Sequence, residues 1–213
     1  MKGERMMSKI RNSGVISVIL SLILGKVSFL ISGVLACIVI LNSDNYILGT
    51  IIAGGIGGLI FGLFYWKDKK IVRMTIAGLC ALLIGFLGSF MLAEGLVSGL
   101  EFLFPSIIGF FEISGIADLI AIILMEIMFG VIFGAIVYGR KSIGLFATVC
   151  GVVSIPCGLL VVAMNSGHHV KVLLSNLFQI FGKIDLNFLV IIVGFGVGIG
   201  LSFGLYRIIK KKE

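Results

Sequence analysis

The chain has 213 residues, of which 59% are hydrophobic and only 13% are charged, and its mean hydropathy is +1.23. Soluble domains average about a quarter charged residues, so lipid is the expected solvent for most of this chain. The net charge is +7, but the basic residues stand at the ends of apolar runs, which favours a membrane explanation over nucleic-acid binding.

Six segments have the length of a membrane-spanning helix, which needs about 20 mostly apolar residues. In chain order they are Gly14–Leu41, Tyr46–Trp66, Val72–Leu92, Ala117–Tyr138, Ile143–Met164 and Leu186–Tyr206. The first is long for one span and contains Lys26, which indicates a tilted helix or a start in the membrane interface. Because Lys26 interrupts its apolar run, we interpret this segment as a retained helix and not as a cleaved signal peptide. The sequence therefore predicts an all-α membrane protein with a six-helix transmembrane bundle.

Charge predicts the direction of these spans, because Lys and Arg are in excess in cytoplasmic loops. Most of the basic residues fall on the side that holds both termini. They are Lys2, Arg5, Lys9, Arg11, Lys67, Lys69, Lys70, Arg73, Arg140, Lys141, Arg207, Lys210, Lys211 and Lys212. Only Lys171 and Lys183 fall on the other side. We therefore expect a multi-pass protein of the cytoplasmic (plasma) membrane with both termini in the cytoplasm.

Two outer segments are too long for simple turns. Residues 166–184 carry apolar side chains at the spacing of one helix face, which predicts an amphipathic helix lying on the outer membrane surface. Residues 94–116 are also apolar but contain Glu101, Glu112 and Pro105. This second segment is expected either to lie on the surface or to enter the membrane as a re-entrant segment.

The second, fourth and sixth spans share a pattern that indicates an internal repeat. Gly-x-x-Phe-Gly occurs at residues 58–62, 130–134 and 200–204, and a lysine follows seven residues after each motif. Cys80 and Cys150 also match at an offset of 70 residues. We interpret the chain as a single membrane domain over residues 1–213 built from three helical hairpins, at residues 14–70, 71–141 and 142–212.

Glycines four residues apart place a small-residue face on each of these three spans. The members are Gly54, Gly58, Gly62, Gly130, Gly134, Gly196, Gly200 and Gly204. Such faces let helix backbones approach closely in lipid. One interpretation is packing among the second, fourth and sixth spans of the same chain. The other is a pore lining, or an interface with a second copy or with other membrane subunits.

Glu126 is the candidate functional residue, because it occupies the position that Gly54 and Gly196 occupy in the other repeats. A carboxylate in the middle of a span costs about 2.5–3.5 kcal/mol or more and commonly marks a pathway, a ligand contact or a buried pair. The structural alternative is a neutral carboxyl group hydrogen-bonded to a neighbouring helix. Lys26 is the second candidate, and it either pairs with Glu126 or extends to the cytoplasmic edge of the membrane.

Motifs of membrane enzymes and of nucleotide hydrolysis are absent from the sequence, so we expect no catalytic residue and no cofactor. It contains no H-E-x-x-H, no G-x-S-x-G and no P-loop. The cysteines stand in apolar runs without C-x-x-C spacing, which favours small core residues over a metal site. A lipid-modifying enzyme that uses Glu94, Glu101 and His168 at the outer interface is a weaker alternative.

The residues leave two main hypotheses for function. A component of a small-solute or ion transport system would use Glu126 within the bundle. A non-catalytic subunit would instead dock other membrane proteins through its glycine faces. In size and helix count the plan is similar to the substrate-binding membrane subunits of energy-coupling-factor vitamin transporters, and that resemblance implies a transport component with transmembrane partners. The sequence favours transport because of Glu126.

Overall fold

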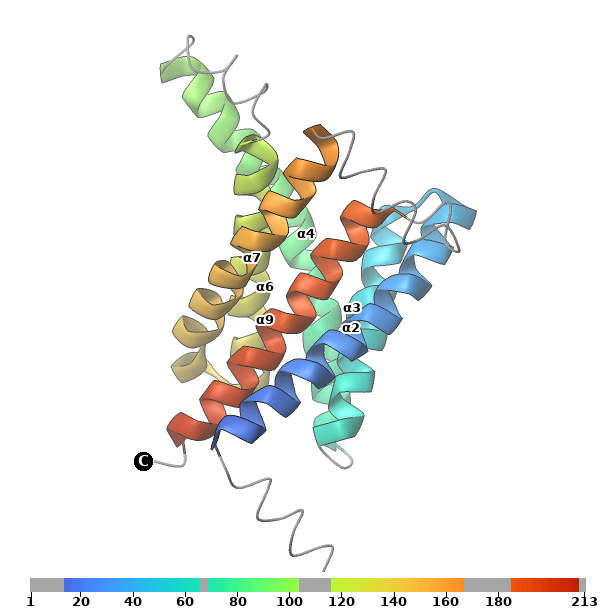
Figure 1. Ribbon diagram of the computed structural model, residues 1–213. Helices are drawn as coiled ribbons and strands as arrows, with labels where there is room; N and C mark the ends of the chain where they lie inside the picture. Colours follow the sequence, from blue (N-terminus) through green and yellow to red (C-terminus); the bar gives the residue numbers. More distant parts are fainter. Residues whose placement is uncertain (1–13, 66–68, 104–115, 167–184, 211–213) are drawn as a thin grey trace, which may run out of the picture.

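The computed structural model describes residues 14–65, 69–103, 116–166 and 185–210 (Figure 1). Within these ranges the chain is helical and contains no strand. Six of its helices are long and apolar enough to cross a membrane. The predicted all-α membrane protein with a six-helix bundle is therefore confirmed.

The helices begin and end close to the predicted limits. They are α2 (Gly14–Ser43), α3 (Tyr46–Tyr65), α4 (Lys69–Leu103), α6 (Ile116–Tyr138), α7 (Ile143–Ser166) and α9 (Leu186–Lys210), with a short 3-10 helix η1 (Arg140–Ser142) before α7. Local residues explain the tight turns. The side-chain oxygen of Asn45 accepts a hydrogen bond from the backbone N–H of Leu48 and so caps α3. Between α6 and η1, Gly139 adopts a φ of 85°, which residues other than glycine rarely adopt.

The largest difference from the predicted limits lies in α4, which continues past Leu92 to Leu103. No proline interrupts the helix before Pro105, and the residue that precedes a proline disfavours helical geometry. Residues 94–103 are therefore a continuation of α4, which extends beyond its neighbours at the end opposite the chain termini (Figure 1). Residues 104–115 and 167–184, where the rest of the predicted outer segments lie, fall outside the described residues.

The six helices form a closed ring in chain order. Each helix contacts the next one, from α2 through α3, α4, α6 and α7 to α9, and α9 contacts α2. The number of spans is even, so α2 begins and α9 ends at the same end of the ring (Figure 1). We call this the basic end, because the described residues there include Lys70, Arg73, Arg140, Lys141, Arg207 and Lys210. The opposite end is called the distal end, and it carries Asp44, Asp118 and Asp185.

The glycine faces hold neighbouring helices of the ring together. A Cβ atom on Gly54 would lie 2.4 Å from the carbonyl oxygen of Gly78 in α4, and one on Gly200 would lie 2.4 Å from that of Ser21 in α2. On α6, a Cβ atom on Gly130 would lie 2.5 Å from the carbonyl oxygen of Phe146 in α7. The same holds for the other members of these faces: Gly58 and Gly62 meet α4, Gly134 meets α7, and Gly196 and Gly204 meet α2.

This arrangement corrects the expected packing of α3, α6 and α9 against one another. Each of these helices turns its glycines towards the first helix of the following hairpin, so the three faces point around the ring and do not converge. These glycines pack against helices of the same chain, so none of the three faces is open to another subunit. The division into three repeated hairpins itself stays a prediction.

Candidate functional site

Glu126 lies near the middle of α6, and its side chain is 0% exposed. Neither carboxyl oxygen has a hydrogen-bond partner among the described residues. The predicted alternative of a carboxyl group hydrogen-bonded to a neighbouring helix is therefore absent from this part of the structure. Burying a polar group without a partner costs about 1–3 kcal/mol by protein mutational data, so this residue is held at the expense of stability.

The surroundings of Glu126 differ from those at the matching points of the ring. Gly54 meets Gly78 at the α3–α4 contact, and Gly196 meets Gly25 at the α9–α2 contact. Gly58 contacts Met74 while Gly130 contacts Phe146, so an offset of 72 residues relates the α3–α4 contact to the α6–α7 contact. That offset places Glu126 and Cys150 where the other contacts have two glycines. The α6–α7 contact therefore carries functional groups at a level where the other two carry only backbone.

Cys157 of α7 and Gly194 of α9 lie beside the carboxyl group, and Cys150 of α7 lies within its electrostatic reach. Cys150 and Cys157 both lie within electrostatic reach of Glu126. A Cβ atom on Gly194 would lie 2.6 Å from Glu126 Oε1 and 2.8 Å from Cys157 Sγ. The absence of a side chain at residue 194 thus makes the space that the carboxyl group occupies.

A cavity of about 210 Å³ lies between α4, α6, α7 and α9 on the distal side of Glu126. Its polar lining comes from Ser89, Asp118 and Asn165, and the last two side chains are exposed at the distal end. Its apolar lining includes Met125, the neighbour of Glu126 in the chain, and Ile122, which stands one helical turn before it. The cavity therefore extends along α6 as far as Met125, the residue directly before Glu126.

On the other side of Glu126, aromatic rings fill the centre of the bundle. Phe129 stacks on Phe195 with ring centroids 4.5 Å apart and meets Phe29 edge-on at 6.1 Å. Further towards the basic end, ring contacts link Phe61, Tyr65, Phe133, Tyr138, Phe146, Phe203 and Tyr206. Below we call these ten residues the aromatic plug.

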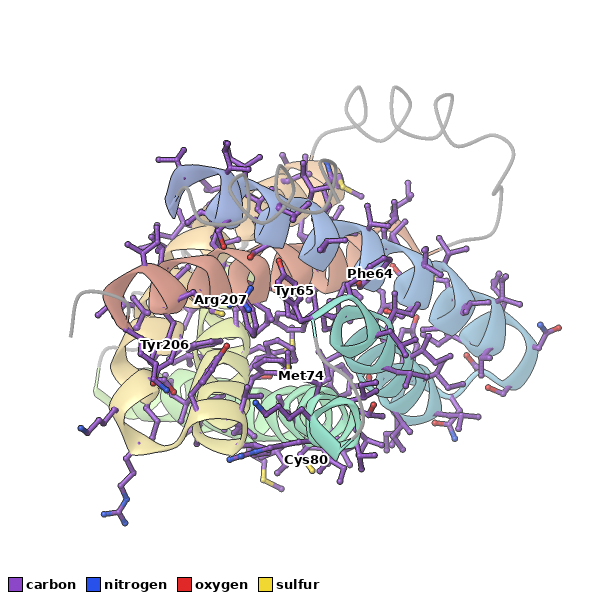
Figure 2. The ribbon with its side chains drawn as sticks, turned by 90° about the horizontal axis from the view of Figure 1, so that it is seen from below. Phe64, Tyr65, Met74, Cys80, Tyr206 and Arg207 are labelled. Atoms are coloured by element: carbon purple, nitrogen blue, oxygen red, sulfur yellow. The ribbon has the colours of Figure 1, made fainter. Side chains whose placement is uncertain are left out.

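Arg207 reaches the basic end of the aromatic plug. Its guanidinium carbon lies 5.1 Å from the ring centroid of Tyr65 and 5.3 Å from that of Phe203, which is the range of a cation–π contact. The hydroxyl of Tyr65 donates a hydrogen bond of 2.6 Å to Ser21 Oγ and so ties α3 to α2. Figure 2, which views the molecule from the basic end, shows Tyr65, Tyr206 and Arg207 gathered between the helices. The plug thus closes the ring at that end.

Lys26 does not reach this site. Its side chain is exposed on the outer face of α2, whereas Glu126 is fully enclosed. The alternative in which the two residues pair is therefore wrong, and the uncharged neighbours of Lys26 on that face, Ile23, Val27 and Leu30, are exposed as well. No group of three or more His, Cys, Asp or Glu side chains in the described ranges is placed to hold a metal ion.

Sequence reasoning identified Glu126 but missed the groups around it. Cys150 was matched with Cys80 at an offset of 70, whereas the offset of 72 between the first two glycine motifs pairs Cys150 with Gly78 and so places it at the level of Glu126. Gly194 was not identified, because it lies outside the set formed by Gly196, Gly200 and Gly204, although it stands four residues before Gly198. The cavity was also missed, since its lining comes from four helices.

Comparison with known proteins adds no identity to this site, because no protein-family model, curated protein or solved structure matches the chain.

Proposed function

We propose that this chain is a membrane-embedded component of a small-solute or ion transport system, with Glu126 as the polar group of the pathway. The observation that carries the proposal is a fully buried carboxyl group, without a hydrogen-bond partner among the described residues, next in the chain to Met125, which lines a cavity with a polar mouth. Ionisable residues inside membrane spans are costly, and those that persist commonly line the paths of ions, protons or substrates.

The cavity gives the proposed pathway a direction. We assign the basic end to the cytoplasm, because Lys and Arg residues gather on the cytoplasmic side of membrane proteins. The cavity then opens to the outside of the cytoplasmic membrane, and the aromatic plug lies between Glu126 and the cytoplasm. This arrangement is that of a carrier whose site is reached from one side at a time.

The proposed role is transport without catalysis. The cavity is lined mainly by apolar side chains, and its polar lining is Ser89, Asp118 and Asn165. These groups can contact a polar solute, but they do not combine a nucleophile with a base oriented by a third group. We therefore propose no enzymatic step and no cofactor.

A non-catalytic scaffold is the alternative. The packing of the glycines argues against a scaffold that docks other membrane proteins through its glycine faces. A partner that used Gly58 or Gly200 would have to displace α4 or α2 from backbone contact. A scaffold would therefore need a different surface of the ring, such as its lipid-facing apolar side chains, which any spanning helix presents to the bilayer.

Replacing Glu126 with Gln in the purified protein tests the proposal, with Asp44→Asn at the exposed turn between α2 and α3 as the control. If Glu126 is a functional group kept at the expense of stability, Glu126→Gln should fold, keep the mass of the wild-type complex and melt at a higher temperature than the wild type. The control should leave the melting temperature unchanged. A Glu126→Gln protein that misfolds or loses a bound subunit would show an assembly role and refute the transport proposal.

A further inference from the structure

The surroundings of Glu126 limit which cation the residue can bind. Alkali and alkaline-earth ions need several oxygen ligands in addition to one carboxylate. The groups beside the carboxyl are instead the thiol of Cys157 and the backbone at Gly194, and the thiol of Cys150 lies within electrostatic reach. Among the described residues, no cluster suited to a metal ion includes Glu126.

The charges around Glu126 also limit what the site can bind. The parts of α4, α6, α7 and α9 that border the site carry no basic group that could neutralise a carboxylate. On α6 the nearest other charged residue is Asp118, two turns away, and α9 has no titratable residue between Ile191 and Ser202. On α7 the titratable groups are Cys150 and Cys157, and on the middle part of α4 the only one is Cys80. A carboxylate here would lack a cationic partner, so it needs a positive charge supplied from outside.

We propose that Glu126 is a proton-binding site, loaded from the distal cavity, and that the cation exchanged by this transport component is H⁺. The inference rests on the transport function proposed above and specifies the ion for the same residue. A proton needs no further ligand once it is bound to a carboxylate oxygen, so it is the one cation that this environment accommodates. Binding converts the carboxylate to the carboxylic acid, and release returns H⁺ to water.

The cavity supplies the water that such an exchange requires. Its volume of about 210 Å³ exceeds the roughly 30 Å³ that one water molecule occupies in the liquid, so several waters fit between its polar mouth and its apolar floor. The apolar lining that we call the floor includes Ile122, Met125 and Ile191, and Met125 directly precedes Glu126 in the chain. Methionine is flexible and adapts readily to gaps, so movement of Met125 is the simplest way for water to reach the carboxyl group.

The experiment is chemical labelling of the wild-type protein in lipid vesicles with dicyclohexylcarbodiimide, a membrane-soluble reagent that adds to protonated carboxyl groups. The adduct on Glu126 is measured by mass spectrometry over a range of pH, with and without Na⁺ or K⁺. We expect labelling of Glu126 that is strongest at acid pH. Above the midpoint of its titration it should fall by about tenfold per pH unit, as the protonated fraction does. Neither Na⁺ nor K⁺ should protect the residue.

Two outcomes of the labelling experiment would contradict proton binding. Protection of Glu126 by Na⁺ or K⁺ at constant pH, or no adduct at any pH, would overturn the proton assignment. Since the labelling uses the wild-type protein, its outcome does not depend on the folding of a variant. A failure of Glu126→Gln to fold would count against the transport proposal alone, and protection by a metal ion would count against the proton alone.

Discussion

The distal and basic halves of the ring are built from the same six helices but are filled in different ways. In the basic half, the aromatic plug occupies the centre, and rings such as Phe129 and Phe195 are 0% exposed. In the distal half, the helices surround a cavity to which the described residues contribute one aromatic side chain, that of Phe86. Glu126 stands at the boundary between the two. Close packing in one half can thus compensate for a costly buried carboxyl group and an open volume in the other.

Helix α6 contributes to both halves and makes the boundary abrupt. Its first turns supply Asp118, Ala121, Ile122 and Met125 to the cavity. One turn after the cavity ends, Phe129 begins the stack that fills the basic half. The change from cavity to packed rings therefore occurs within about one turn, at the level of Glu126.

The largest expected effect is a difference in access to water between the halves. In a variant without its four native cysteines, Ala121→Cys should react quickly with a membrane-impermeant methanethiosulfonate added on the distal side, whereas Ser202→Cys should not react from either side. Ala121 lines the cavity, whereas Ser202 is 0% exposed and lies beside the plug residue Phe203. Thiols react as thiolates, which form where water reaches them. Equal labelling of both cysteines would contradict the comparison.

A smaller effect is expected from opening space in the plug. Phe129→Ala removes a fully buried ring and should lower the free energy of unfolding by about 3–5 kcal/mol, the usual range for a packed core. The matched control is Phe64→Ala, because Phe64 is 59% exposed on the outer side of α3. Thermal melts of both variants in the same detergent measure the difference. If the control loses as much stability as Phe129→Ala, the plug is not the main source of stability.

The smallest effect is expected for one hydrogen bond at the basic end. Tyr65→Phe removes the bond to Ser21 Oγ and should cost about 1 kcal/mol, the usual net value of a hydrogen bond inside a protein. Tyr46→Phe is its counterpart at the distal end, where the exposed hydroxyl donates to Asp185 Oδ2 at 3.0 Å. Water can replace that partner, so its loss should change the melting temperature less. The reverse order would show that the distal end is the better-ordered half.

Much of the fold follows from local signals in the sequence. Hydrophobic length and the distribution of charge are enough to predict six spans with nearly correct limits, because the need to satisfy backbone groups in lipid leaves only helices for such segments. The predicted span Val72–Leu92 agrees with the apolar part of α4, Lys70–Ser89, but hydropathy did not predict that the same helix continues to Leu103.

The candidate site was harder to predict, because it depends on the relation between helices. Glu126 was recognisable from its own charge within an apolar run. Its neighbours Cys150 and Gly194 come from α7 and α9, and nothing in their local sequence indicates that they face the same point. The glycine faces were recognised as packing faces, but their partners depend on the order of helices around the ring, which periodicity does not encode.

Closure of the ring by α2 and α9 has a consequence for biosynthesis. Membrane helices are made in chain order, and N-terminal units generally form first. The face of α2 formed by Val18, Ser21 and Gly25 has its partner glycines in α9. It therefore stays without its partner helix until nearly the whole chain has been made. A product that stops before α9 would leave this face open to any other small-residue helix, and unassembled copies should be recognised there by the membrane quality-control machinery of the cell.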